Sequence, residues 1–259
     1  MEPIIVELKN VSLIYHDPFA ETLAIDDLNL TIREGEFAAI VGPSGCGKTS
    51  MLNLLCGLTR PSSGEVLLGG NKVTSPGDGI GYMLQHDHLL EWRDVEANIV
   101  LGLEVKNMLN EKTRAYALDL LERHGLMEFR HHYPQQLSGG MKKKVALIRT
   151  LAFDPTLLLL DEPFSALDYQ TRLHISDEVH KIIKQEHKTA LLVTHDISEA
   201  ISMADRVLVF SDRPARVKKE FEIKLNAPDS PIARRQAPEF RGYFDSIWKE
   251  IEYREKALQ

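Results

Sequence analysis

Hydrophobic and polar positions divide this chain of 259 residues into three successive patterns. Between residues 4 and 36, apolar and polar positions alternate, as they do through Val11, Leu13 and Tyr15, and this alternation predicts short β-strands. Residues 95–153 have the apolar spacing of helices, and from residue 157 onward apolar runs alternate with amphipathic stretches. Strands and helices that alternate in this way are typical of a doubly wound α/β fold.

Individual elements can be assigned in the second half of the chain. Leu157–Leu160 is wholly apolar and has the length of a buried parallel strand. The pattern then predicts a helix, a strand, a helix and a strand at about residues 170–185, 190–193, 197–204 and 207–210. Near the C-terminus, helical spacing of apolar residues predicts an amphipathic helix through Phe240, Phe244, Ile247, Trp248 and Ile251. We expect this stripe to pack on its own domain, with the groove of a partner as the alternative.

A glycine-rich loop connects an apolar strand at residues 36–41 with a helix that begins near Ser50. Its glycines allow backbone N–H groups to close around an anion, and the helix N-terminus adds a favourable dipole. In this context Lys48 is expected to reach the β- and γ-phosphates of a nucleoside triphosphate, and the Thr49 hydroxyl is expected to bind Mg²⁺. A chance match is the alternative, but the strand–loop–helix context argues against it. The predicted nucleotide-binding residues are Gly42, Pro43, Ser44, Gly45, Cys46, Gly47, Lys48, Thr49 and Ser50.

The composition is that of an ordinary soluble globular protein, with 43% apolar and 27% charged residues. A net charge of −7 argues against a general nucleic-acid-binding role. No stretch approaches the roughly 18–20 apolar residues that a membrane-spanning helix needs, and the N-terminus has no basic-then-apolar signal pattern. We therefore expect an intracellular protein whose association with a membrane would require a partner.

The two cysteines lie close together in the sequence, Cys46 in the glycine loop and Cys56 on the helix that follows. Their positions suit reduced thiols rather than a disulfide framework. We expect Cys46 to be a small residue that fills a tight loop, with a reactive thiol at a helix N-terminus as the alternative.

Two acids follow the apolar run at Leu157–Leu160. In P-loop nucleoside triphosphatases, an acid at the end of a strand beside the phosphate loop holds the Mg²⁺ shell, and Asp161 has this position. Glu162 comes one residue later, so its side chain is expected on the other side of the strand end. There it could orient and deprotonate an attacking water. The alternative is a pair of acids at a helix start, where the helix dipole also favours them.

A second anion-binding element is predicted at Ser138, Gly139 and Gly140, which open a helix at residues 142–151. A plain serine N-cap with flexible glycines is the alternative. One triphosphate does not need two such cradles within a single subunit. A triphosphate that bridges two subunits would use both.

These motifs occur in the order found in ATP-binding cassette (ABC) ATPases, and the chain resembles this family almost from end to end. The resemblance matches Tyr15 to the family's adenine-stacking aromatic residue, Gln85 to its glutamine at the junction with the helical part, and His195 to its switch histidine. Residues 137–141 match its signature sequence, and residues 165–168 match the loop that crosses its dimer interface.

Within this family, the chain is similar to the cassettes of importers for nitrate, sulfonates, taurine and related small compounds, through residues 89–93, 137–141 and 210–217. It departs from the usual pattern at three places. These are Glu91 in place of proline, Lys143-Lys144 in place of Gln-Arg, and Ile148-Arg149-Thr150 in place of Ala-Arg-Ala. None of the departures touches a predicted phosphate ligand. The substrate class rests on kinship, because cassettes do not contact the cargo.

The resemblance implies one nucleotide-binding domain over residues 1–259, with an α/β P-loop NTPase core of the RecA-like type. It also implies an N-terminal antiparallel β-subdomain and a helical subdomain that carries the signature. The expected boundaries are about 1–85 and 157–225 for the β-subdomain and core, 86–156 for the helical subdomain and 226–259 for a C-terminal helical extension.

The resemblance further implies a mechanism that needs two copies. One subunit holds MgATP, with Tyr15 stacked on the adenine, and residues Ser138, Gly139 and Gly140 of a second, head-to-tail subunit cover the γ-phosphate. Binding closes the dimer, and hydrolysis releases it. The implied catalytic residues are Glu162, His195, Lys48 and Gln85, and the implied metal ligands are Thr49, Gln85 and Asp161.

The implied partners are a second cassette subunit, transmembrane permease subunits and, indirectly, an extracytoplasmic substrate-binding protein, with no nucleic acid. The chain would then be a peripheral subunit at the cytoplasmic face of the cell membrane. We expect His88, Leu89, Leu90 and Trp92 to form an exposed apolar patch for a permease helix. Coverage of the helical core by the same residues is the alternative.

Two other classes of protein compete with the importer subunit. A soluble ABC ATPase that is not coupled to transport would carry two cassettes in one chain or a long coiled-coil insertion, and the sequence has neither. A P-loop kinase or GTPase would lack a motif like the one at residues 137–141. It would also need an acceptor- or guanine-binding site, for which the sequence offers no candidate.

Overall fold

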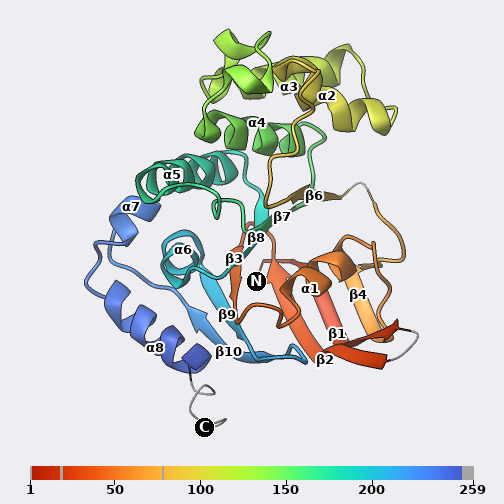
Figure 1. Ribbon diagram of the computed structural model, residues 1–259, viewed down its shortest axis with the longest axis vertical. Helices are drawn as coiled ribbons and strands as arrows, with labels where there is room; N and C mark the ends of the chain where they lie inside the picture. Colours follow the sequence, from red (N-terminus) through yellow and green to blue (C-terminus); the bar gives the residue numbers. More distant parts are fainter. Residues whose placement is uncertain (1, 18–19, 78, 253–259) are drawn as a thin grey trace.

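A computed structural model describes residues 2–17, 20–77 and 79–252 of the chain (Figure 1). Within these residues the strands form a four-stranded antiparallel sheet with the order β2-β1-β4-β5 and a six-stranded sheet with the order β10-β9-β3-β8-β7-β6. The first sheet contains β1 (Ile4–Asp17), β2 (Ala20–Arg33), β4 (Ser63–Leu68) and β5 (Asn71–Lys72). The second sheet contains β3 (Phe37–Val41), β6 (Ile80–Met83), β7 (Leu157–Asp161), β8 (Thr189–Thr194), β9 (Arg206–Phe210) and β10 (Val217–Glu222).

The helices lie in three places around these sheets. One group follows the strands of the six-stranded sheet and contains α1 (Lys48–Leu55), α5 (Tyr169–Gln185) and α6 (Ile197–Met203). A helical block at one end of the molecule, at the top of Figure 1, contains α2 (Val95–Val105), α3 (Glu111–Arg123) and α4 (Gly139–Leu151). The C-terminal part adds α7 (Pro231–Arg234) and α8 (Phe240–Glu252). In the described ranges, no helix combines the length and the apolar character needed to cross a membrane.

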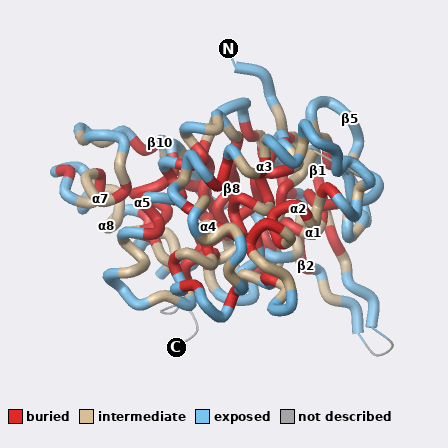
Figure 2. Tube along the Cα trace, turned by 90° about the horizontal axis from the view of Figure 1, so that it is seen from above, coloured by how far each residue is buried: buried red, intermediate tan, exposed pale blue. Residues whose placement is uncertain are grey.

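The six-stranded sheet is buried on both of its faces. In β3, Phe37, Ala39 and Val41 face the hydrophobic cluster that includes α5 and α6. Ala38 and Ile40 face the opposite cluster, which includes α1 and the antiparallel sheet. Figure 2 shows the buried residues concentrated through the middle of the molecule. This two-sided burial explains why the strands at the centre of the sheet are apolar at nearly every position, and the predicted α/β fold is confirmed.

The N-terminal β region differs from the sequence-based expectation. The alternation predicts several short strands, but β1 and β2 each contain 14 residues and pair along one long antiparallel hairpin. The register shifts between Leu8 and Val11, and Asn10 has a left-handed conformation with φ of 48°. The interruption in the alternating pattern therefore marks a β-bulge rather than the end of a strand.

The helices of the helical block begin at side-chain caps. α3 begins after Asn110, whose side chain accepts the Thr113 N–H at 3.0 Å in a capping box. α2 begins after Asp94, which accepts the Ala97 N–H at 2.8 Å. These caps satisfy backbone donors that would otherwise lack partners at the helix starts.

The expected apolar patch at residues 88–92 is only partly correct. Trp92 is 75% exposed and Leu90 is partly exposed, but Leu89 is 8% exposed and belongs to the hydrophobic core. Asn98 of α2 binds both the N–H and the carbonyl oxygen of Leu90, at 2.8 and 3.1 Å. These bonds hold the chain against the helical block, so the preceding side chain packs inward. The expectation of an exposed Leu89 is wrong.

The C-terminal amphipathic helix packs on its own domain, as predicted. α8 lies against α6, β9 and β10, and Ile247 is fully buried. The short helix α7 is fixed to α5 and α6 by polar contacts. Arg234 donates to the carbonyl oxygen of Ala204 at 2.6 Å, and the Ser230 hydroxyl bonds the Asp177 carboxylate at 2.5 Å.

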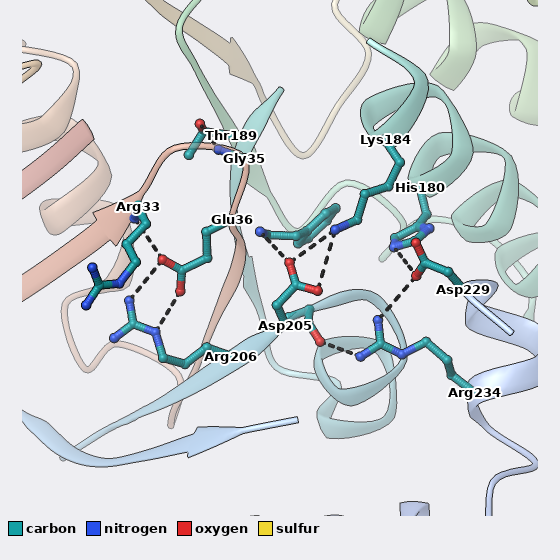
Figure 3. Close-up of polar contacts among 12 residues, drawn as sticks. Arg33, Gly35, Glu36, His180, Lys184, Thr189, Asp205, Arg206, Asp229 and Arg234 are labelled. Atoms are coloured by element: carbon teal, nitrogen blue, oxygen red, sulfur yellow. Dashed lines mark hydrogen bonds and ion pairs between the residues drawn. The ribbon is translucent and has the colours of Figure 1, made fainter. Parts of the chain in front are cut away.

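A network of polar side chains lies where the strands of the central sheet begin (Figure 3). Asp205 accepts the Phe37 N–H at 2.9 Å and the Lys184 ammonium at 3.1 Å. Arg206 pairs with Glu36 at 2.7 Å. The network satisfies polar groups at this edge of the sheet and leaves the opposite edge, where the parallel strands end, for other chemistry.

His180 of α5 is buried beside this network. It packs against the ring of Phe37, with ring centroids 5.7 Å apart, and its Nε2 lies 3.6 Å from Asp229. Burial lowers its pKa below the usual 6.5, the charges of Lys184 and Arg234 lower it further, and the carboxylates of Asp229 and Asp205 oppose the shift. Because the unfolded chain binds the proton more readily, this histidine destabilises the fold as pH falls below about 6.5.

We expect His180→Phe to reduce the loss of stability on acidification. Between pH 7 and 5 the variant should lose less unfolding free energy than the original chain, because it lacks a side chain that takes up a proton more readily in the unfolded state. Denaturant unfolding over this pH range measures the difference. Burial lowers the pKa of His124 as well, but His124 is present in both proteins, so the difference between their profiles isolates His180. Parallel profiles would contradict the prediction.

Candidate nucleotide-binding and catalytic site

Most of the predicted site residues come together at the carboxyl edge of the parallel strands. β3 leads into the glycine loop, β7 ends at Asp161, and β8 leads to His195. β6 leads toward Gln85, and β9 leads toward Arg213. Because these strands run parallel, their carboxyl ends meet at one edge, and segments distant in the sequence can face one ligand there.

The loop at residues 42–47 has a shape that depends on glycine. Gly47 has φ of 121°, and a Cβ atom there would lie 2.9 Å from the carbonyl oxygen of Ala24. A Cβ atom at Gly42 would lie 3.1 Å from the Cβ atom of Phe210. Helix α1 begins directly after the loop, so its N-terminus faces the loop. The loop and the helix together fit an anion such as a phosphate.

Lys48 is folded over this loop. It is 7% exposed, and its Nζ donates to the carbonyl oxygens of Gly42 at 2.8 Å and Pro43 at 2.9 Å. The Cys46 side chain is buried beneath it, with Sγ 4.0 Å from Nζ, and burial raises the pKa of the Cys46 thiol. A buried thiol with a raised pKa agrees with the expected small residue in a tight loop rather than with a reactive cysteine.

The glycine loop opens into a cavity of about 270 Å³. Tyr15 lies at this cavity, is 41% exposed, and donates its hydroxyl hydrogen to Ser50 Oγ at 3.1 Å. Of the predicted loop residues, Gly42, Pro43 and Cys46 do not line this cavity. The residues that line it are Tyr15, Thr22, Ala24, Ser44, Gly45, Gly47, Lys48, Thr49, Ser50, Glu162 and Arg213.

Asp161 is anchored at the end of β7. Its Oδ2 accepts the hydroxyl hydrogen of Tyr82 on the neighbouring strand at 3.0 Å. Burial raises the pKa of Asp161, while the Tyr82 hydrogen bond and the Lys48 charge oppose the rise and Glu162 adds to it. A partly buried carboxylate is a favourable ligand for an incoming cation, because the cation compensates the cost of burying the charge.

Glu162 faces the cavity and is held by neighbouring loops. Its φ of 45° is unusual for a residue other than glycine, and its N–H donates to the carbonyl oxygen of Val193 at 2.8 Å. Its Oε2 lies 3.1 Å from His195 Nδ1. Gln85 joins this group because its Nε2 donates to Ser165 Oγ at 3.1 Å, and that hydroxyl donates to the Glu162 carbonyl oxygen at 3.0 Å. The structure therefore brings Gln85, Glu162 and His195 together.

The second predicted anion-binding element lies away from this cavity. Ser138 caps α4 by accepting the Met141 N–H at 3.3 Å, and both Ser138 and Gly139 are exposed. Gly140 is buried, and a Cβ atom there would lie 2.4 Å from Ile175 Cδ1. Among the described residues, none of these three lines the cavity. Within one chain, the structure does not bring the two elements together.

Three residues that line the cavity were not among the predicted site residues, namely Thr22, Ala24 and Arg213. The Arg213 guanidinium donates to the carbonyl oxygen of Gly45 at 3.1 Å and so holds the phosphate loop from outside. The sequence contains a signal for Arg213, because this residue follows the strand predicted at residues 207–210 of a doubly wound fold, in which ligands bind at the carboxyl ends of the strands. The sequence contains no comparable signal that Thr22 and Ala24, on the β1–β2 hairpin, would approach the phosphate loop.

Three features define the class of protein as a P-loop nucleoside triphosphatase. They are a glycine loop before a helix, an acid at the end of a nearby strand and a second acid at the cavity. Comparison with known proteins identifies the family. A model of the ABC transporter family matches residues 25–165, which is more than half of the chain. The chain therefore belongs to the ABC transporter family, as a cassette that binds and hydrolyses ATP.

Similar sequences cover most or nearly all of the chain. It is 44% identical over 252 residues to YtlC, an uncharacterized ABC transporter ATP-binding protein of Bacillus subtilis (strain 168), and the match covers 97% of both proteins. It is 43% identical over 202 residues to TauB, the taurine import ATP-binding protein of Yersinia pestis bv. Antiqua (strain Antiqua). That match covers 78% of this chain and 79% of TauB.

Solved cassettes share the fold. The ATP-binding cassette MJ0796, a dimer in a post-hydrolysis state bound to ADP and Pi, matches with a TM-score of 0.71 and 34% identity over 85% of this chain and 99% of its own. The cassette cbiO1 from Clostridium perfringens, part of the ABC transporter complex cbiONQ, matches with a TM-score of 0.76 and 27% identity. This match covers 86% of this chain and 90% of cbiO1.

We expect Arg213→Ala to weaken ATP binding about fivefold, because it removes a hydrogen bond to the phosphate loop and a positive charge from the cavity. Titration of the protein with ATP in a calorimeter measures the dissociation constant. The matched control is Arg216→Ala, since Arg216 pairs with Asp26 and does not line the cavity. Equal affinities for the two variants would argue against a role for Arg213 in nucleotide binding.

Proposed function

We propose that this ABC ATPase is the ATP-hydrolysing subunit of a membrane importer and that it works as a head-to-tail pair of copies. The observation that carries the proposal is the separation of its two anion-binding elements. Lys48 and the glycine loop line the cavity, whereas Ser138 and Gly139 are exposed elsewhere. A triphosphate held by one copy would meet Ser138 and Gly139 of the other copy, which uses both elements at once. The dimeric MJ0796 cassette supports this arrangement.

In this proposal ATP joins the two copies. Tyr15 stacks on the adenine, and Lys48 with the glycine loop binds the phosphates. The second copy adds donors to the γ-phosphate through Ser138 and the backbone of Gly139 and Gly140. Because hydrolysis detaches the γ-phosphate that both copies share, nucleotide binding closes the pair and hydrolysis opens it.

Glu162 is the proposed general base. It lines the cavity, where it can accept the proton of a water that attacks the γ-phosphorus while the bond to the β–γ bridging oxygen breaks. Its contact with His195 orients the carboxylate and brings a second polar group to the reacting phosphate. Lys48 contributes a positive charge that stabilises the negative charge of the transferred phosphoryl group.

The site also fits Mg²⁺. In the described residues no cluster of three or more His, Cys, Asp or Glu side chains could hold a metal alone. Mg²⁺ in nucleotide sites is held by one or two protein oxygens together with phosphates and waters, and neutralises phosphate charge. The Thr49 hydroxyl, the Asp161 carboxylate and the Gln85 amide are the proposed protein ligands, and Asp161 has the partly buried oxygens that a cation would satisfy.

The proposed membrane partner is a pair of permease subunits that bind at residues 88–93. This segment follows Gln85, and its Trp92 side chain is 75% exposed, which is unusual for a large aromatic residue without a partner. The cbiO1 cassette, which belongs to the complex cbiONQ, supports assembly of this kind. In this role the chain would lie at the cytoplasmic face of the cell membrane, held there by the permease.

The proposed cargo is a small anionic or zwitterionic compound of the nitrate, sulfonate or taurine kind. The identity of 43% with the taurine import protein TauB supports this class. The cargo would bind the permease and an extracytoplasmic binding protein, so the residues of this chain do not select it.

The paired mechanism predicts how Glu162→Gln behaves. The variant should bind MgATP, hydrolyse it about 10²–10⁴-fold more slowly, and accumulate as an ATP-bound dimer, because the base is lost and the nucleotide ligands remain. Adding Ser138→Arg should preserve ATP binding but keep the protein monomeric, because the larger side chain blocks the second cradle. Size-exclusion chromatography with light scattering, with and without MgATP, distinguishes these states.

If Glu162→Gln forms no ATP-bound dimer with MgATP, either as the isolated chain or within the assembled transporter, the result is incompatible with the shared site. A dimer of the double variant that is as stable as that of Glu162→Gln would also be incompatible, since it would assemble without Ser138.

The proposed docking segment predicts a separation of activity from assembly. Trp92→Ala should leave the ATPase activity of the isolated chain nearly unchanged and reduce co-purification with the permease, as expected when an aromatic anchor is lost from an interface. Trp248→Ala is the matched control, because Trp248 is 48% exposed on α8, in the C-terminal part. Equal recovery of the permease with both variants would remove the support for docking at Trp92.

A further inference from the structure

A buried lysine of α4 reaches the loop that carries Gln85. This loop, residues 85–94, connects β6 with α2, and we call it the coupling loop. Lys143 is 2% exposed, and its Nζ donates to the carbonyl oxygen of Gln85 at 2.8 Å and pairs with Asp87 Oδ1 at 2.8 Å. The family pattern usually has glutamine at this position, so this charge and its carboxylate partner distinguish the chain.

The coupling loop is held along its length by two further side chains. Arg149, also on α4, donates to the carbonyl oxygens of Asp87 at 2.6 Å and His88 at 2.7 Å. Asn98 of α2 is fully buried and binds the backbone of residues 90–94 with four hydrogen bonds. The described residues of the coupling loop form neither helix nor strand. Their backbone is instead fixed by side chains of α2 and α4.

The other end of this connection lies at the catalytic acid. The Gln85 side chain donates to Ser165 Oγ, and Ser165 Oγ donates to the Glu162 carbonyl oxygen, at 3.1 and 3.0 Å. Polar contacts thus run from Lys143 on α4, through the backbone and side chain of Gln85, to the residue proposed as the general base. The exposed Ser138 caps the same helix, α4.

We propose that Lys143 is a positioning residue that fixes the coupling loop, and with it Gln85, to helix α4. The proposal rests on the proposed catalytic role of Gln85 and adds the residue that holds it in place. When a second copy engages Ser138 and displaces α4, the coupling loop moves with the helix, because side chains of α2 and α4 hold its backbone. The position of Gln85 relative to Glu162 therefore depends on the position of α4.

The Lys143 ammonium binds the Gln85 carbonyl oxygen and the Asp87 carboxylate at once, and its positive charge strengthens both contacts. Hydrogen bonds between charged partners are shorter and stronger than those between neutral partners. A methionine at this position would fill a similar volume without a donor or a charge. The Asp87 side chain is 21% exposed, so water can still solvate part of its carboxylate when the lysine is removed, whereas Oδ1, which faces Lys143, is buried and would lose its partner. The fold should then persist while the position of the loop is lost.

The test is a double-mutant cycle in steady-state ATP hydrolysis with Lys143→Met and Gln85→Ala. Each single variant should lower kcat about 10- to 100-fold, because a small misplacement of a positioning group costs this much. The dissociation constant for ATP should change less than threefold, since the glycine loop holds the nucleotide. The double variant should be as slow as Gln85→Ala to within about twofold, because Lys143 acts through Gln85.

Two further variants complete the design. Lys144→Met is the matched control, because Lys144 is the next residue on α4 and pairs with Glu178 at 3.1 Å; its kcat should stay unchanged. Asp87→Asn keeps the shape of the loop but removes the charge opposite Lys143, and it should lower kcat in the same direction. If Lys143→Met does not fold, as judged by circular dichroism and thermal unfolding, Asp87→Asn takes its place in the cycle.

If the double variant loses kcat by the product of the two single losses, the proposal is overturned, because Lys143 then acts independently of Gln85. A normal kcat for Lys143→Met beside a reduced kcat for Gln85→Ala would overturn the proposal alone and leave the proposed function intact. An unchanged kcat for Gln85→Ala would overturn the catalytic role of Gln85 and the positioning role of Lys143 together.

Discussion

The charge of a triphosphate, bound at the edge of a parallel sheet, is the constraint on which this structure depends. The loop whose backbone N–H groups would surround the anion packs so closely on its neighbours that only glycine fits at Gly42 and Gly47. The strand order then decides which groups reach the anion. Because β8 lies beside β3 and β7 lies beside β8, all three in parallel, Asp161, Glu162 and His195 arrive at the same edge from distant parts of the chain.

In the proposed mechanism a second copy covers the open side of the nucleotide cavity, and this gives a reason for the position of the helical block. The donors that would cover that side, at Ser138 and Gly139, lie at the start of α4 and outside the cavity. A site divided between two copies is complete only while nucleotide joins them, so the chemistry of ATP can drive a movement of whole subunits. In the same proposal, the coupling loop, from Gln85 to the exposed Trp92, would transmit that movement to the protein surface.

The sequence predicted the features in which local residue type dictates conformation. The glycine loop, the apolar strand β7 and the stripe of α8 depend on backbone freedom or burial within a few residues. Features that depend on tertiary contacts were missed. Leu89 is buried because Asn98 fixes the adjacent backbone, and Arg213 reaches the phosphate loop only because β9 ends beside β3. Lys143 was visible only as a departure from a family pattern. The roles of the site residues stay predictions.

Subunit complementation tests the shared site most directly. Lys48→Ala should disable the phosphate loop of one chain, and Ser138→Arg should disable the second cradle of another, so neither protein alone should hydrolyse ATP appreciably. A mixed dimer would contain one site with an intact Lys48 from one chain and an intact Ser138 from the other. We predict that mixing the two inactive proteins restores ATP hydrolysis with a rate that rises with their concentration. If the mixture hydrolyses ATP no faster than the two proteins measured separately, the account of a site completed by a second copy is contradicted.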